Sequence, residues 1–146
     1  MRIMHRLSIS GPTHHAANLT KFLSSKFETI LITGMLADGE KDGSFILQEL
    51  GIQPHYIQSM KRSINPLQDI KALFEIYRWI QKEKPVIVHT HAAKSGTLGR
   101  LAAILAGVPI IIHTFHGHTF HSYFNKLVTK FFIRIERFLA SRSTKI

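Results

Sequence analysis

Histidine is concentrated in two short segments in the second half of the chain. Each segment directly follows a run of β-branched residues typical of a parallel strand that is buried on both faces. The histidines of these segments are His89, His91, His113, His116, His118 and His121. Neutral imidazole can donate to and accept from sugar hydroxyls, and protonated imidazole can meet phosphate. The two segments are therefore the first candidates for a ligand-binding surface.

These histidines raise the question of a metal site. No Asp or Glu accompanies the six histidines between His89 and His121, and their spacing matches none of the usual helical zinc pairs. The chain also has no cysteine, which excludes thiolate ligands and disulfides. We therefore expect no metal and no cofactor. A polar-ligand surface is favoured over the alternative that the imidazoles only satisfy loop carbonyls.

A second candidate site lies near the N-terminus, where Gly11 and Pro12 follow a predicted first strand. Glycine lets the backbone approach a ligand, and proline suits the first position of a helix, whose N–H groups attract phosphate. The dinucleotide fingerprint G-x-G-x-x-G and the P-loop are absent, and no acid ends the second predicted strand, so NAD binding is not expected. The loop alone is equally compatible with an anion site and an ordinary tight turn.

Strands and helices that could position these residues alternate along the chain. Strands are predicted at 2–8, 28–34, 52–58, 86–88 and 110–112, and helices at 13–26, 44–50, 65–82, 97–106 and 123–140. This alternation predicts an α/β fold with a doubly wound, Rossmann-like parallel sheet in the order 3-2-1-4-5. Strands one and four then lie side by side at the switch point, beyond whose carboxyl ends ligands bind.

Two predicted helices have apolar faces that we assign to the core. In the helix at 65–82 the inward residues are predicted to be Leu67, Ile70, Leu73, Phe74, Tyr77 and Ile80. The last helix, at 123–140, is interpreted as a core helix with a basic outer side, or as a helix that contacts anionic lipid. Ser95 is a candidate N-cap for the helix between the histidine segments. A further strand is expected to start at 141–146.

Charge is distributed unevenly along the chain. The formal net charge is +10, and nine Lys and Arg but only Glu136 among the acids lie from Lys84 onward. A one-sided basic surface implies an anionic partner such as a nucleotide, a phospholipid or nucleic acid. No nucleic-acid motif is present, so nucleic acid is not expected. The N-terminus lacks the apolar core of a signal peptide, and no apolar run approaches the length of about 18 residues that a membrane span needs.

Two longer stretches carry a resemblance to a known family. HTHAAKSGTLGRLAAILAGVPIIIHTFHGHTF, preceded by PLQDIKALFEIYRWIQKEKPVIVHTH, resembles the N-terminal domain of family 4 GT-B glycosyltransferases. The resemblance covers essentially the whole chain and is greatest to bacterial enzymes of capsule, exopolysaccharide and lipopolysaccharide assembly. Members of this family have two Rossmann-like domains, of which the N-terminal one mainly binds the acceptor and the C-terminal one binds the nucleotide sugar.

The resemblance also implies roles for individual residues. Gly11 would lie near the donor pyrophosphate, and His116 would touch the transferred sugar as the catalytic residue. The acceptor side would be lined by His14, His91, Lys94 and His118. The family's own E-x7-E belongs to its C-terminal domain, so Glu75 and Glu83 are interpreted as surface charges.

We therefore expect the N-terminal part of a retaining, metal-independent hexosyltransferase of cell-surface polysaccharide synthesis. It would use a nucleotide-sugar donor and a saccharide or polyprenyl-phosphate-linked acceptor, in the cytoplasm and peripherally on the inner face of the membrane. Residues 1–146 would be a truncated piece, inactive without the absent C-terminal donor-binding domain. The alternative is a stand-alone binding module, or a subunit completed in trans by a donor-binding chain.

Overall fold

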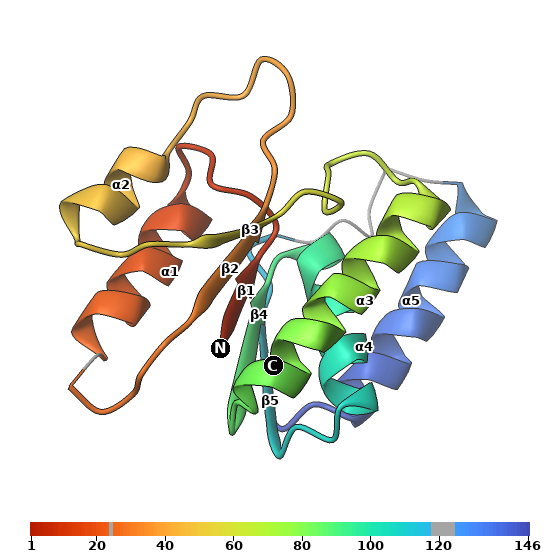
Figure 1. Ribbon diagram of the computed structural model, residues 1–146. Coiled ribbons are helices and arrows are strands. Elements are labelled where there is room, and N and C mark those ends of the chain that lie inside the picture. Colours follow the sequence, from red (N-terminus) through yellow and green to blue (C-terminus); the bar gives the residue numbers. More distant parts are fainter. Residues whose placement is uncertain (24, 118–124) are drawn as a thin grey trace.

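The computed structural model describes residues 1–23, 25–117 and 125–146. Strands and helices alternate along the chain (Figure 1). They are β1 (Arg2–Met4), α1 (Gly11–Phe22), β2 (Leu31–Gly34), α2 (Ser44–Glu49), β3 (His55–Ile57), α3 (Pro66–Glu83), β4 (Ile87–His91), α4 (Ala93–Leu105), β5 (Ile110–Thr114) and α5 (Lys126–Ser141). The first strand is shorter than the predicted 2–8, and the first helix starts two residues earlier than predicted.

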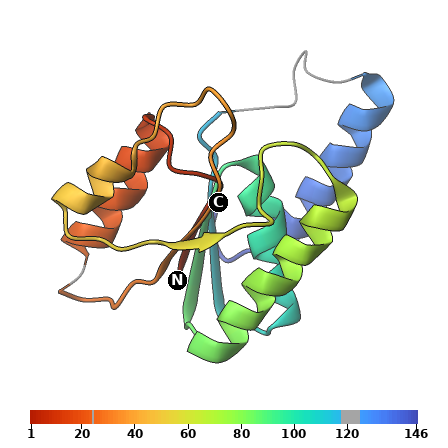
Figure 2. The same ribbon diagram turned by 45° about the horizontal axis from the view of Figure 1, so that its top comes forward.

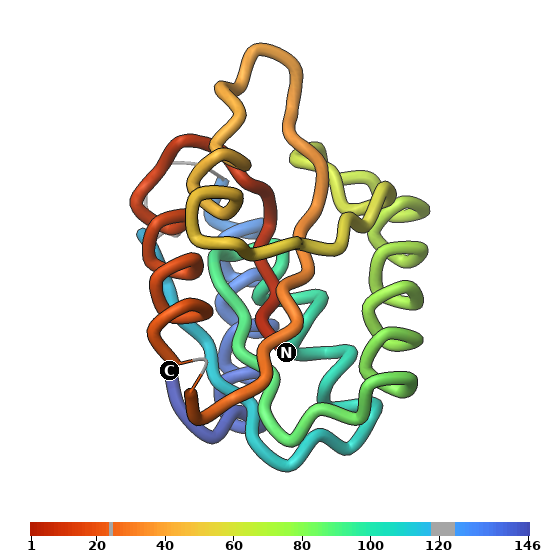
Figure 3. The backbone as a smooth tube through the Cα atoms, turned by 60° about the vertical axis from the view of Figure 1, so that its left-hand side comes forward, coloured from red at the N-terminus to blue at the C-terminus, as the bar shows by residue number. Residues whose placement is uncertain are grey.

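All five strands are parallel, in the order β3-β2-β1-β4-β5, which confirms the predicted topology. Helices α1 and α2 cover one face of the sheet and α3, α4 and α5 cover the other (Figures 1 and 2). The loops that follow β1, β2 and β3 emerge at one end of the molecule (Figure 3). Lys145 bridges to Ile112 in parallel, so the expected further strand begins beside β5.

The sheet separates two apolar clusters, because neighbouring strand residues point to opposite faces. Ile3 and Ile32 pack with α3 and α4 through Ala72, Ile76, Ala102 and Ala103. Met4 and Leu31 pack with α1 and α2 through Ala16, Ala17 and Leu47. The small alanines let the helices lie close to the strands. This packing on both faces fixes the positions of the carboxyl ends of the strands.

The predicted inward face of α3 is wrong for some of its large residues. Leu67, Ile70 and Phe74 are 81%, 52% and 61% exposed, and the buried residues of this helix are Ala72, Ile76 and Ile80. The helix carries two apolar stripes, and the one with the small alanine packs inward because it permits a closer approach. The prediction is confirmed for Ile80, which is buried, and for Leu73 and Tyr77, which are partly buried and pack against the core.

Helix α5 differs from the predicted core helix in a similar way. Among its described residues only Leu139 is fully buried, whereas Leu127, Phe131 and Phe138 are 80%, 61% and 49% exposed. The helix is fixed to α4 by Arg100, whose buried guanidinium donates two hydrogen bonds of 2.6 Å to the carboxylate of Glu136. This bidentate ion pair holds α5 against the layer while leaving much of its apolar surface outside.

Candidate functional site

Three imidazoles from three elements converge at the carboxyl edge of the sheet. His91 ends β4, His116 follows β5, and His15 lies in the first turns of α1. Nδ1 of His91 is 3.1 Å from Nε2 of His116, and the two rings stack with centroids 5.3 Å apart. The His15 ring meets them edge-on, at 5.7 Å from His91 and 5.4 Å from His116. We call these three residues the histidine cluster.

The turn between β4 and α4 fixes His91. Helix α4 begins at Ala93, earlier than predicted, and its N-cap is Ala92 in the left-handed region, with φ of 65°. The Ser95 hydroxyl donates to the His91 carbonyl, so Ser95 is not the N-cap but ties the first turn of the helix back to the strand end. His91 is 1% exposed and is therefore held in one place.

Two further histidines of these segments, His89 and His113, bond to neighbouring strands. Nε2 of His89 is 2.8 Å from the hydroxyl oxygen of Thr114, and Nδ1 of His113 is 2.8 Å from that of Thr90. A Cβ at Gly96 would collide with the imidazole of His113, so glycine is needed there for α4 to pack on the sheet. These two histidines bond to polar groups of the sheet, whereas His15 and His116 of the cluster are open to solvent.

Burial favours the neutral form of two members of the cluster, His91 and His116, because it lowers the pKa of each. It lowers the pKa of His91 to about 2, and the positive charge that His89 and Arg2 can carry acts in the same direction. Burial likewise lowers the pKa of His116, with a smaller contribution from His15. Neutral imidazole has one donor and one acceptor nitrogen, so the partly exposed ring of His116 can bond to a hydroxyl group in either sense. The site therefore suits a polyhydroxylated ligand better than a charged one.

The remaining predicted site residues lie in different surroundings. Gly11 is exposed at the start of α1, and a Cβ there would meet nothing within 4 Å. His14 is exposed, and it is its neighbour His15 that contacts the cluster. His118 lies outside the described residues. The family resemblance implied a role for His14, which points away from His15 because successive helical residues are turned by 100°.

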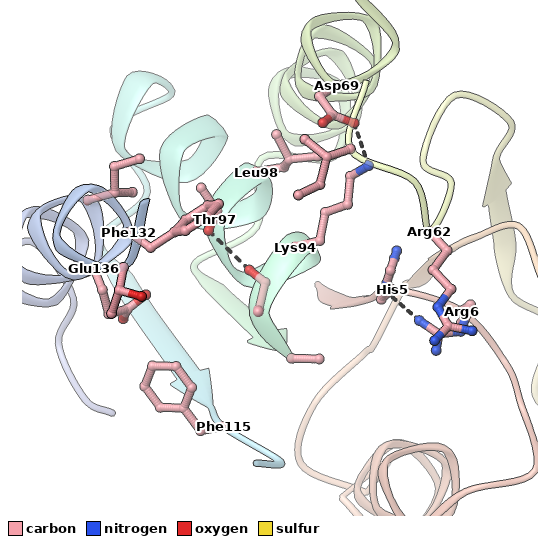
Figure 4. Close-up of a pocket in the computed structure, with 15 residues that line it drawn as sticks. His5, Arg6, Arg62, Asp69, Lys94, Thr97, Leu98, Phe115, Phe132 and Glu136 are labelled. Carbon is pink, nitrogen blue, oxygen red and sulfur yellow. Dashed lines mark hydrogen bonds and ion pairs between the residues drawn. The ribbon is translucent and has the colours of Figure 1, made fainter. Parts of the chain in front are cut away.

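Lys94 is bonded to the loop between β3 and α3. Its Nζ lies 2.5 Å from a carboxylate oxygen of Asp69 (Figure 4). It also donates to the carbonyls of Lys61, at 2.8 Å, and Ser63, at 2.5 Å. The side chain thus anchors that loop over α4, and its charge is already neutralised by Asp69. Sequence reasoning missed Asp69, which lies 25 residues away and carries no motif.

A cavity of about 510 Å³ lies at the same edge of the sheet, beside Ala92. One end is apolar and is formed by α4, α5 and the residue after β5, through Leu98, Phe115, Phe132 and Ile135. The other end is basic and contains Arg6 and Arg62 (Figure 4). Both arginines contact the carboxylate of Glu40, at 2.7 and 3.2 Å, so two positive charges face one negative charge. The cavity therefore combines an apolar end with a net cationic end.

The topology of the sheet identifies the fold class of this domain. A five-stranded parallel sheet in this order, with helices on both faces, is the Rossmann-like half of a GT-B fold. The chain is similar in structure to Methanocaldococcus jannaschii UDP-GlcNAc 2-epimerase, which was solved with UDP-GlcNAc and UDP, with a TM-score of 0.63 and 17% sequence identity. The match covers 97% of this chain and 43% of the epimerase chain. Over 93% of its length the chain superposes on 38% of Acinetobacter baumannii MurG, with a TM-score of 0.59 and 17% identity.

The chain belongs to glycosyltransferase family 4, whose model matches residues 9–146. It is 40% identical over 95 residues to the Escherichia coli UDP-Gal:alpha-D-GlcNAc-diphosphoundecaprenol alpha-1,3-galactosyltransferase. These residues make up 65% of this chain and 24% of that protein. The chain is 28% identical over 116 residues to the Staphylococcus aureus capsular polysaccharide biosynthesis glycosyltransferase CapM, covering 80% of this chain and 29% of that protein. The chain thus matches only 24% and 29% of the length of these relatives. Within the part of the chain that the structure describes, no helix is long and apolar enough to cross a membrane.

Proposed function

We propose that this chain is the acceptor-binding half of a glycosyltransferase of bacterial surface polysaccharide synthesis. The complete enzyme transfers a hexose from a nucleotide sugar to a saccharide or a polyprenyl-diphosphate-linked sugar. The observation that carries the proposal is the histidine cluster, in which buried His91 contacts His116 at the switch-point edge of a family 4 domain. The names of the two relatives support the substrate class.

His116 is the residue that contacts the transferred sugar. It is partly exposed, and its Nε2 is engaged by the buried Nδ1 of His91, so the orientation of its ring is restrained. A restrained neutral imidazole presents a hydrogen bond to a sugar hydroxyl without reorganising during the reaction. His91 acts as a positioning residue for His116.

Gly11 is the donor-phosphate contact. It opens α1, whose N-terminal end carries a partial positive charge and attracts phosphate. The open space around Gly11 lets the pyrophosphate approach the backbone. The rest of the donor site is supplied by a second domain or a separate donor-binding chain. In a retaining transfer the donor phosphate then provides charge near the developing oxocarbenium, and the protein positions both substrates.

The cavity beside α4 receives the acceptor. A lipid-linked sugar has an apolar chain and a diphosphate, which match the apolar end and the Arg6 and Arg62 end of the cavity. Lys94 lines the cavity, and its role and those of His91, His14 and His118 in holding the acceptor stay predictions.

The outward faces of α3 and α5 hold the enzyme on the cytoplasmic face of an anionic membrane. On α5 the exposed Leu127 and Phe131 lie beside the exposed Lys126, Lys130, Arg134 and Arg137 at helical spacing. On α3 the exposed Leu67 and Phe74 lie in the same helical layer (Figure 1). Apolar groups flanked by cations suit a surface of anionic lipid, where a polyprenyl-linked acceptor also resides.

The transfer assay uses a longer protein that contains this domain and its donor-binding half, screened against nucleotide sugars and diphospholipid-linked acceptors. His116→Ala is expected to reduce kcat by about 100-fold or more, the magnitude typical for losing one positioned hydrogen-bonding group. His55→Ala, an exposed histidine on the far edge strand β3, is the matched control. Full activity of the His116→Ala enzyme would overturn the assignment. The 146 residues alone are expected to give no transfer.

A further inference from the structure

We propose that His15, His91 and His116 form a binding site for a divalent transition metal of the zinc class. Each residue offers one imidazole nitrogen, and the three nitrogens all lie within 4.8 Å of one another. The composition of the two histidine-rich segments alone did not indicate such a site. The third ligand, His15, comes from α1, which lies far away in the sequence and is placed there by the fold.

Two of the three ligands are already at the spacing that a metal requires. Zinc binds imidazole nitrogen at about 2.0–2.1 Å, so two nitrogens on a tetrahedral ion lie about 3.3 Å apart. Nδ1 of His91 and Nε2 of His116 are 3.1 Å apart. Binding replaces the hydrogen bond between them, and the imidazole that donates it moves its proton to its other ring nitrogen. His15 is exposed and can turn its ring to complete the set.

The donor set selects the kind of metal. Three imidazoles with no carboxylate suit Zn²⁺, Cu²⁺ or Ni²⁺, whereas Mg²⁺ and Ca²⁺ require oxygen ligands. Three protein ligands leave one position of a tetrahedral ion open. That position faces outward, because His15 is exposed and His116 is partly exposed. This open position would bind water or an oxygen anion.

The expected consequence is reversible inhibition of sugar transfer. A metal held by His91 and His116 replaces the hydrogen bond between them, which is the contact proposed to orient His116 towards the sugar. This consequence rests on the proposed function, whereas metal binding itself does not. The two can therefore be tested separately.

Binding is measured on the 146-residue chain by titration with Co²⁺, whose visible absorption reports tetrahedral nitrogen ligation, and by calorimetry with Zn²⁺. We expect one tight site, no response to Mg²⁺, and a loss of affinity of about tenfold or more in His15→Ala. His14→Ala removes an exposed histidine next to His15 and is expected to keep the affinity of the unmodified chain. Because His15 is exposed, its substitution is expected to leave the thermal midpoint unchanged.

Two results would overturn the site. One is an equal loss of metal affinity in His14→Ala and His15→Ala, which would indicate adventitious binding by surface histidines. The other is an unchanged metal affinity in His15→Ala. Inhibition is tested on the longer enzyme with Zn²⁺ and with a chelator that reverses it. Metal bound at the cluster without inhibition would leave the site in place and contradict the role of His116 in the proposed function.

Discussion

At the scale of single residues, the site depends on which imidazoles are anchored. His91 is buried and tied by its carbonyl to Ser95, and it orients the more exposed His116. The sequence predicts both residues, because they follow β-branched strands. It does not predict that His15 lies against them, because the direction of a side chain on a helix depends on where the helix starts. Nor does it predict that Lys94 is bonded to Asp69.

Gly11 provides a prediction at this scale. Its φ is not in the left-handed region and the space around it is open, so Gly11→Val should fold normally. In the longer enzyme the added side chain should block the donor pyrophosphate and weaken nucleotide-sugar binding by about tenfold, the equivalent of one or two lost hydrogen bonds. Calorimetric titration with the nucleotide sugar measures this. Asn18→Val, on an exposed position further along α1, is the control, and equal affinity of both variants would contradict the phosphate role of Gly11.

At the scale of elements, the sequence predicts the order and type of every strand and helix but not which side of two helices faces inward. The β-branched runs identify β4 and β5, and alternation identifies the parallel sheet. In α3 two apolar stripes compete, and the small residue Ala72 decides the outcome. In α5 the position of the helix is set by the Arg100–Glu136 ion pair, which joins residues 36 apart and has no local sequence signal.

The exposed face of α5 provides a prediction for membrane binding. Substituting both Leu127 and Phe131 by serine should reduce co-sedimentation with anionic vesicles, because it removes exposed apolar surface. Lys130→Gln should weaken binding by about fivefold, since a basic residue near an anionic surface contributes about 1 kcal/mol. Phe45→Ser is the matched control, because Phe45 is 44% exposed on α2, across the sheet. If the control lost as much binding as the double variant, the α5 surface would not be the contact.

At the scale of the whole molecule, the fold buries histidines that the unfolded chain would expose to protons. Burial, followed by the nearby charge of Arg100, lowers the pKa of His113 to about 4, and burial also lowers that of His5 to about 4. The unfolded chain takes up protons as the pH falls below about 6.5, whereas the folded chain resists until about pH 4. The stability is therefore fully present above about pH 6.5 and is lost progressively towards pH 4.

Urea unfolding at about pH 7.5 and about pH 5 tests this dependence. His113 alone should lower the free energy of unfolding at the lower pH by about 2 kcal/mol, with a smaller loss from the partly exposed His5. An equal or greater free energy of unfolding at about pH 5 would show that these histidines are protonated without cost in the folded state.

The central claim is that this domain holds the acceptor. The most direct measurement is a titration of the 146-residue chain with a short-chain GlcNAc-diphospholipid, followed through the histidine side-chain resonances. We expect shifts in the resonances of His91 and His116 and tighter binding of this compound than of a nucleotide sugar. Binding of the nucleotide sugar alone, with the resonances of both histidines unchanged by the lipid-linked sugar, would contradict the account.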